Sequence, residues 1–207
     1  MDNNMTILLI LLSYLTGAFP SAFIVGKSFF SIDIRQHGSG NAGATNTFRV
    51  LGKVAGTIVL IIDVFKGWLV VNFVYLFSSI NINPELIFEY QLLFGVFAVV
   101  GHLFPVYTRF RGGKGIATLL GLLIGLHSFS AIVSCMVFIT VLIAFRYVSL
   151  ASIFSAIAFP IIIYFFTESS DVSLIIFSIF VPLLALSTHH KNIKRLLRGQ
   201  ERKIKFK

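Results

Sequence analysis

The sequence predicts an all-α integral membrane protein, a polytopic helical bundle with about seven transmembrane helices. Apolar residues make up 57% of its 207 residues and charged residues only 12%, whereas charged residues form about a quarter of an average soluble domain. The mean hydropathy is +0.91. Apolar stretches recur along the whole chain, and most of them suffice to cross a hydrocarbon layer of about 30 Å as a helix. We expect one membrane domain over residues 1–207.

Each apolar stretch is separated from the next by a short polar segment. The first stretch lacks a basic start and is longer than the apolar region of a secretory signal, which favours a retained helix. The fourth is short, because a helix of about twelve residues rises only about 18 Å, and it suits a half-span. The expected spans are 5–26, 57–78, 86–107, 115–126, 129–145, 149–167 and 172–187.

The basic residues predict the orientation. Of the 17 Lys and Arg residues, only Lys66 lies within an expected span. The alternate connections at 1–6, 79–85, 127–128 and 168–171 contain no Lys or Arg. The positive-inside rule therefore places the N-terminus outside and the C-terminus in the cytoplasm, which requires an odd number of spans.

The net charge of +9 does not require nucleic acid as a partner. About half of the cations lie in the tail after residue 188, where anionic lipid headgroups attract each one by about 1 kcal/mol. Cys135 is the single cysteine and lies within a span, so neither a disulfide nor a thiolate metal site is available.

Three polar patches fall on the predicted cytoplasmic side. The first, residues 38–49 (GSGNAGATNTFR), alternates glycines with Ser39, Asn41 and Asn46. Glycine lets the backbone approach a ligand closely, and successive amides form an anion-binding concavity. Arg49 follows Asn46 by three residues and lies beside it if a helix has begun there. The alternative is a plain loop of turn-forming residues.

The second patch, residues 101–115, contains the run Arg111-Gly112-Gly113-Lys114 just before a helix expected to begin at Ile116. A helix start offers unpaired amides and a partial positive charge, which suit a phosphate. Thr108 and Gly115 replace the residues that a Walker loop requires, which argues against an ATPase. The alternative is a glycine turn with an orienting lysine. His102 is either an interfacial side chain or part of the site.

The third patch, residues 188–199, is expected to lie on one helix. At spacings of three and four residues, His189 and Asn192 share a face with Arg195 and point towards the bundle, which leaves His190 for solvent. A metal site would need more histidines or carboxylates than the local Glu201 supplies, so none is expected here.

Two ionisable residues lie inside the second expected span. Asp63 and Lys66 are three residues apart, so they are neighbours on one helix face and able to pair. Charges within a span are costly and are usually paired or functional. We expect a structural ion pair.

The polar patches, in this order, resemble the bacterial acyl-phosphate:glycerol-3-phosphate acyltransferase family, small membrane-embedded enzymes that begin phospholipid synthesis. Within the long motifs, Ile116 stands where the family often has valine. The matching pieces are GAFPSAFIVGK (17–27), DIRQHGSGNAGATNTFRVLGK (33–53), DVFKG (63–67), GHLFPVYTRFRGGKGIAT (101–118), RYVSLASI (146–153) and THHKNIKRLLRGQE (188–201).

The resemblance implies seven helices in the bacterial inner (cytoplasmic) membrane and an active site on the cytoplasmic side. It implies transfer of an acyl group from acyl phosphate to the 1-hydroxyl of glycerol 3-phosphate, which gives 1-acyl-glycerol 3-phosphate and phosphate. No cofactor or metal is implied. The expected partners are the two substrates and membrane lipid, with the enzyme that makes acyl phosphate as a further candidate.

The resemblance also implies site residues. As catalytic groups we expect Ser39, Lys114, His189 and Asn192. As substrate- and phosphate-binding groups we expect Arg49, Asn41, Asn46, Gly112, Gly113, Arg111 and His102. The His-x-x-x-x-Asp motif of acyltransferases that use soluble donors does not occur. An activated donor suits such a chain, and the base is hypothesised to be the donor's own phosphate.

Two other classes of protein fit part of the pattern. A transporter of small organophosphates would explain the basic patches and the Asp63–Lys66 pair. Such a transporter usually has duplicated halves and a site near mid-membrane, and no repeat is visible here. A lipid-binding scaffold leaves the order of the motifs unexplained.

Overall fold

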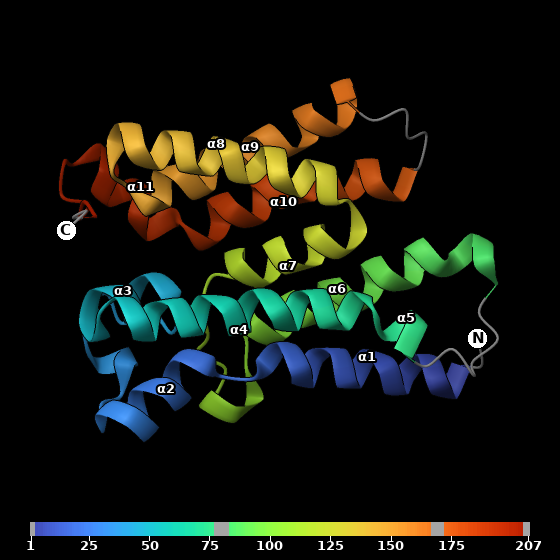
Figure 1. The fold of residues 1–207 in the computed structure, drawn as a ribbon, viewed down its shortest axis with the longest axis horizontal. Coiled ribbons are helices and arrows are strands. Elements are labelled where there is room, and N and C mark those ends of the chain that lie inside the picture. The colour runs from blue at the N-terminus through green and yellow to red at the C-terminus, as the bar shows by residue number, and fades with distance from the viewer. Residues whose placement is uncertain (1–2, 77–82, 167–171, 205–207) are drawn as a thin grey trace. The chain divides into compact units, whose positions relative to one another are not determined.

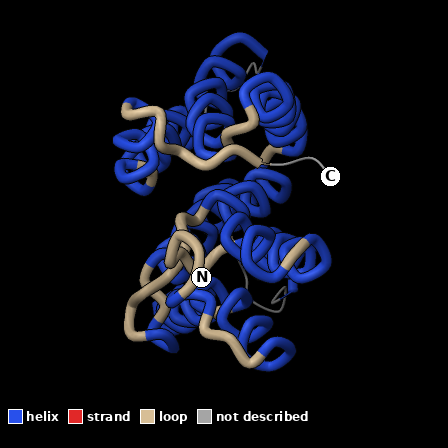
Figure 2. Tube along the Cα trace, turned by 90° about the vertical axis from the view of Figure 1, so that its left-hand side faces the viewer, coloured by secondary structure: helices blue, strands red, loops and turns tan. Residues whose placement is uncertain are grey.

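The computed structural model describes residues 3–76, 83–166 and 172–204, in which every regular element is a helix (Figure 2). Within them, four helices are long and apolar enough to cross a membrane, or up to six if each of two bent pairs is one span. The predicted all-helical bundle is confirmed. Seven spans and the orientation stay predictions, and the connections at 79–85 and 168–171 lie wholly or partly outside the described residues.

The chain forms two compact units, Met1–Leu126 and His127–Lys207. In both units many large apolar side chains are exposed, such as Phe65, Ile139 and Phe165. Apolar exposure on this scale is rare on soluble monomers and suits contact with lipid tails.

The first unit begins with a broken span, where the sequence predicts a continuous one over 5–26 (Figure 1). Helices α1 (Asn3–Ala18) and α2 (Ser21–Phe30) meet at an angle of 42°. Pro20 causes the break, because it has no N–H and disfavours helical geometry at the residue before it. The other elements are η1 (Ile34–Gln36), α3 (Ala44–Leu51), α4 (Lys53–Val71), α5 (Phe73–Leu76), η2 (Pro84–Leu86), α6 (Ile87–Leu103), η3 (Val106–Thr108) and α7 (Ile116–Leu126).

Two close helix crossings hold the first unit together. A Cβ at Gly101 of α6 would overlap the backbone of α1 at Tyr14, and a Cβ at Gly67 of α4 would overlap the backbone of α7 at Thr118. Small residues at such crossings let helices approach closely within a membrane. The crossings bring the end of α1 and Lys66 of α4 beside the second patch, which begins at the end of α6 and leads into α7.

The second unit contains α8 (Ser128–Phe145), α9 (Val148–Phe166), α10 (Val172–Thr188) and α11 (His190–Leu197). Phe159 and Phe177 pack edge to face in its core, with ring centroids 6.2 Å apart. The third patch does not lie on one helix as expected, because α10 and α11 meet at 64° with His189 at the break.

Candidate active site

Asn46 organises the first patch from the buried side of α3. Its Oδ1 accepts a hydrogen bond of 2.8 Å from the backbone N–H of Ser39, and its Nδ2 donates to the carbonyls of Ile34 (3.1 Å) and His37 (3.0 Å). Gly38 has a left-handed φ of 66°, and a Cβ there would overlap the Asn46 amide. Asn46 is 1% exposed and bonded to three backbone groups, so it positions the loop. Phosphate binding by Asn46 stays a prediction.

Arg35 connects the first patch to the second, a role that the sequence did not reveal. Its guanidinium donates to both carboxylate oxygens of Asp33, at 3.0 and 2.8 Å, and to the carbonyl of Thr108 at 3.2 Å. It also lies over the ring of Phe23, 4.7 Å from the centroid. The hydrogen bond from Arg35 lowers the pKa of Asp33. The two loops are therefore fixed to each other through one side chain.

The glycine turn of the second patch wraps around His102 at the end of α6. The N–H of Gly113 donates to the carbonyl of His102 at 3.1 Å. A Cβ at Gly112 would overlap the carbonyls of His102 and Leu103, and one at Gly113 would overlap Nε2 of the His102 ring. Residues with side chains do not fit either position. Helix α7 begins at Ile116, as the sequence predicts.

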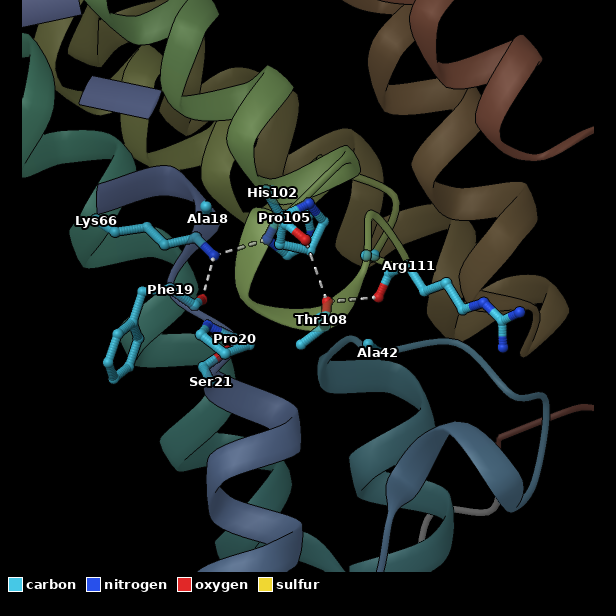
Figure 3. Close-up of a pocket in the computed structure, with 12 residues that line it drawn as sticks. Ala18, Phe19, Pro20, Ser21, Ala42, Lys66, His102, Pro105, Thr108 and Arg111 are labelled. Carbon is cyan, nitrogen blue, oxygen red and sulfur yellow. Dashed lines mark hydrogen bonds between the residues drawn. The ribbon is translucent and has the colours of Figure 1, made fainter. Parts of the chain in front are cut away.

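Buried charges lie directly beside this turn, and the expected ion pair is confirmed. Nζ of Lys66 lies 2.9 Å from Oδ1 of Asp63. It also lies 2.8 Å from Nδ1 of His102 and 3.3 Å from the carbonyl oxygen of Phe19 (Figure 3). Oγ of Ser21 donates to Oδ1 of Asp63 at 2.7 Å. The broken span supplies this cluster, because the interruption of α1 and α2 leaves the Phe19 carbonyl turned towards Lys66.

The first two patches and the buried charges line one small cavity of the first unit (Figure 3). Its volume is ≈ 10 Å³, about that of one water molecule, so this conformation encloses no substrate. The first patch contributes Ala42 to its wall, the charged cluster contributes Lys66, and most of the other lining residues belong to the broken span and the second patch. The lining residues are Ala18, Phe19, Pro20, Ser21, Ala42, Lys66, His102, Pro105, Thr108, Arg111, Gly112 and Gly113.

A larger groove of ≈ 440 Å³ runs between α1 and α4. It shares Phe19 and Lys66 with the small cavity, and most of its other walls are apolar. A mostly apolar groove that lies beside the glycine turn is suited to the tail of a ligand whose anionic head binds the turn. The groove is lined by Leu12, Leu15, Thr16, Phe19, Ile62, Phe65, Lys66, Leu69 and Tyr107.

In the second unit, His189 and Asn192 point inwards and His190 is exposed, as predicted from their spacing. Nδ1 of His189 lies 2.9 Å from the carbonyl oxygen of Ala185. A carbonyl oxygen accepts but cannot donate, so Nδ1 carries the proton in the neutral ring, and Nε2 is left as an acceptor. In the neutral ring, Nε2 of His189 is therefore the nitrogen that carries the lone pair.

The carboxylate of Glu201 accepts hydrogen bonds from Asn192 and Arg195 of the third patch, a role that the sequence did not reveal. Its Oε1 accepts from Asn192 at 2.6 Å and from Ser149 at 2.9 Å, and its Oε2 accepts from Arg195 at 2.7 Å. Burial acts to raise the pKa of Glu201, but the hydrogen bonds from Asn192, Arg195 and Ser149 outweigh it and lower the pKa. In the described part of the chain, no group of three His, Cys, Asp or Glu residues is arranged to hold a metal ion.

The predicted site residues are therefore distributed over both units. The structure brings His102, Arg111, Gly112 and Gly113 together at the small cavity. Arg49 is exposed on the last turn of α3, and Lys114 is half-buried just before α7. The first unit holds Ser39, Asn41, Asn46, Arg49, His102, Arg111, Gly112, Gly113 and Lys114, and the second holds His189 and Asn192.

The family model described as glycerol-3-phosphate acyltransferase matches residues 7–199. The chain belongs to this family. Glycerol-3-phosphate acyltransferases from Staphylococcus aureus strains Newman and JH9 are 44% identical to it over 207 residues, which cover 98% of this chain and 99% of theirs. The chain is thus an acyltransferase, and its relatives act on glycerol 3-phosphate.

Solved structures agree with this family membership. The crystal structure of PlsY (YgiH), an integral membrane glycerol 3-phosphate acyltransferase, in its glycerol 3-phosphate form has a TM-score of 0.86 and 32% identity, and covers 97% of this chain and 96% of that one. The lysophosphatidic acid form has a TM-score of 0.82 and 31% identity with the same coverage. The fold of this chain is the fold of an integral membrane enzyme.

Proposed function

We propose that this acyltransferase moves a fatty acyl group from acyl phosphate to the 1-hydroxyl of glycerol 3-phosphate, which forms 1-acyl-glycerol 3-phosphate and inorganic phosphate. One observation carries the choice of donor. The small cavity at the glycine turn and the larger groove between α1 and α4 share Lys66 and Phe19. A phosphate at the turn and an acyl chain in the groove match the two ends of an acyl phosphate.

In the proposed reaction, the glycerol hydroxyl oxygen bonds to the carbonyl carbon of the donor, and the bond from that carbon to the phosphate oxygen breaks. Phosphate leaves as an anion, so the enzyme mainly has to orient two phosphorylated molecules, and orientation contributes about 7–11 kcal/mol. Arg49 and Lys114 supply positive charge. A cation about 4 Å from a phosphate charge is worth about 4 kcal/mol at an effective dielectric of about 20. Ser39 and Asn41 add polar groups on the exposed loop.

The hydroxyl proton goes to the departing phosphate or to Nε2 of His189, which the Ala185 carbonyl leaves as an acceptor. We assign Asn192 to substrate binding next to Glu201.

A single domain over residues 1–207 is proposed, and the family match from 7 to 199 supports it because it spans both units. The positive-inside pattern supports a cytoplasmic membrane location with the patches facing the cytoplasm.

The test is a comparison of donors. Purified protein in lipid nanodiscs receives glycerol 3-phosphate with acyl phosphate, acyl-CoA or acyl carrier protein, and both the acylated product and free phosphate are measured. We expect product and phosphate in equal amounts with acyl phosphate, and neither ligand alone should release phosphate, which also separates transfer from transport. An equal rate with acyl-CoA would contradict the proposed donor.

A further inference from the structure

All three N–H donors of the Lys66 ammonium group have acceptors in the structure. A protonated lysine has three N–H donors and no acceptor. In the structure three acceptors surround Nζ: the carboxylate of Asp63, the carbonyl of Phe19 and Nδ1 of His102. Nδ1 is therefore the accepting nitrogen of the His102 ring, and the proton of the neutral ring lies on Nε2. The carboxylate of Asp63 lies 3.7 Å from Nδ1, too far for a hydrogen bond that would place the proton there.

The other side of the same ring carries the glycine turn. Nε2 lies against Gly113, so closely that a Cβ at this position would overlap it. In addition, the carbonyl oxygen of His102 accepts a hydrogen bond from the N–H of Gly113. The ring orientation that Lys66 sets and the position of the turn are therefore coupled through one residue. His102 and Lys66 are both buried, with 7% and 4% of their surfaces exposed, so the contacts between them are shielded from solvent.

We propose that Lys66 is a positioning residue for the phosphate site: it holds His102 with Nε2 protonated and facing Gly113, and thereby sets the affinity of the glycine turn for a phosphate group. The inference rests on the proposed function of that turn. Asp63 and Ser21 support this arrangement. The Asp63 carboxylate balances the charge of Lys66, and the Ser21 hydroxyl donates a hydrogen bond to that carboxylate. A pair that only neutralises charge inside the membrane would predict a different result when both charges are removed together.

The first experiment removes both charges. The double variant D63N/K66M keeps the approximate volumes and leaves no unbalanced charge, so we expect nearly normal folding by thermal unfolding and size-exclusion chromatography. K53M, at the start of α4 and exposed, is the matched control. Binding of inorganic phosphate and of glycerol 3-phosphate is measured by calorimetry, and KM is measured separately for glycerol 3-phosphate and acyl phosphate. Comparing the two KM values shows whether the turn binds the phosphate of glycerol 3-phosphate or that of acyl phosphate.

We expect D63N/K66M to raise KM or Kd about tenfold for the ligand whose phosphate binds the turn, equivalent to about 1.4 kcal/mol, with a smaller change in kcat. K53M should match the wild type. Wild-type KM and Kd values in the double variant for both phosphate ligands would overturn the inference and leave charge neutralisation as the role of the pair.

The second experiment does not depend on the folding of a variant. Nitrogen-15 NMR of wild-type protein labelled at histidine reports which ring nitrogen is protonated, and H102Q identifies the His102 signal. We expect a bare Nδ1 and a protonated Nε2. A protonated Nδ1 would overturn the inference. Because this spectrum and the calorimetry need no acyl donor, a failure of the acyl phosphate proposal is distinguishable from a failure of this one.

Discussion

Asn192 donates a hydrogen bond of 2.6 Å to the carboxylate of Glu201, nine residues further along the chain. The same carboxylate accepts from Ser149 of α9 and from Arg195 of α11. The Glu201 side chain thus orients the amide of Asn192, a predicted site residue, and links α11 to α9 through hydrogen bonds. Hydrogen bonds to a charged group contribute about 1.5–3 kcal/mol each, so this contact matters for stability as well as for geometry.

Replacing Glu201 should make the protein less stable, and the loss should depend on pH. Because the folded state lowers the pKa of Glu201, its stabilising contribution is complete above the unfolded pKa of about 4.3 and is lost as the pH falls through the folded value. We expect E201Q to lower the thermal midpoint at pH 7 and to weaken the decline towards pH 3. Unfolding curves of both proteins across this range provide the measurement. An unchanged midpoint at pH 7 would show that the cluster contributes no net stability.

The two glycines of the turn should differ when each becomes alanine. At Gly112 the new methyl group would overlap backbone carbonyls, whereas at Gly113 it would meet the end of the His102 side chain. We expect both variants to raise KM for a phosphorylated substrate, with G112A the more severe, because a side chain is displaced more easily than backbone. G199A tests the cost of a methyl on a left-handed glycine with open space around it, and its kinetics should stay normal. Wild-type kinetics in both turn variants would make this stretch only a connector.

The histidines at the break between α10 and α11 should have opposite importance. His189 is buried and leaves Nε2 as an acceptor, while His190 is exposed. We expect H189A to lose most transferase activity and H190A to resemble the wild type in steady-state assays. H189N retains a donor for the Ala185 carbonyl. Partial activity in H189N would indicate orientation by hydrogen bonding, and almost none would indicate proton transfer. Equal damage at both positions would contradict the assigned face.

Removing one proposed phosphate-binding cation should reduce turnover by orders of magnitude. R49A and K114A each remove a charge whose attraction to phosphate is worth about 4 kcal/mol at about 4 Å and an effective dielectric of about 20. K114R should rescue poorly, because a flat guanidinium does not replace a compact ammonium beside the turn. Initial rates at saturating donor, with expression measured in parallel, check this, and K53M again serves as control. Full activity in K114A would mean that the backbone amides of the turn suffice.

The orientation can be tested with single cysteines introduced after Cys135 is replaced. Asn46 and Thr108 are buried, so their exposed neighbours Thr45 and Tyr107 are the better sites. A thiol reagent that cannot cross the membrane should label neither in intact cells, but should label both after the membrane is opened. Cysteine at Glu85, in a predicted outer connection, should react in intact cells. Outside labelling of Thr45 or Tyr107 variants would reverse the proposed topology.

Local patterns in the sequence predicted the helical bundle, the Asp63–Lys66 pair and the inward face of His189 and Asn192, because each depends on spacing along one helix. They did not predict the roles of Arg35 and Glu201. Those roles depend on partners far away in the chain, since Arg35 reaches Thr108 and Glu201 reaches Ser149.

Two further features have the same physical origin. The residue type of Asn46 suits an anion, and the sequence does not show that its amide also forms hydrogen bonds with three backbone groups. The break at Phe19 was missed because the apolar run continues through Pro20, and hydropathy does not report the missing N–H.

That break gives Lys66 a form of solvation that side chains do not provide. In an unbroken helix the Phe19 carbonyl would accept the N–H of Phe23. Here it accepts from the N–H of Ser21 and from the Lys66 ammonium. A peptide oxygen carries no net charge and does not titrate. It therefore solvates the buried ammonium at every pH, as a water molecule would, and no second carboxylate is needed. Interrupting one helix has therefore turned its own backbone into part of a polar environment inside an apolar bundle.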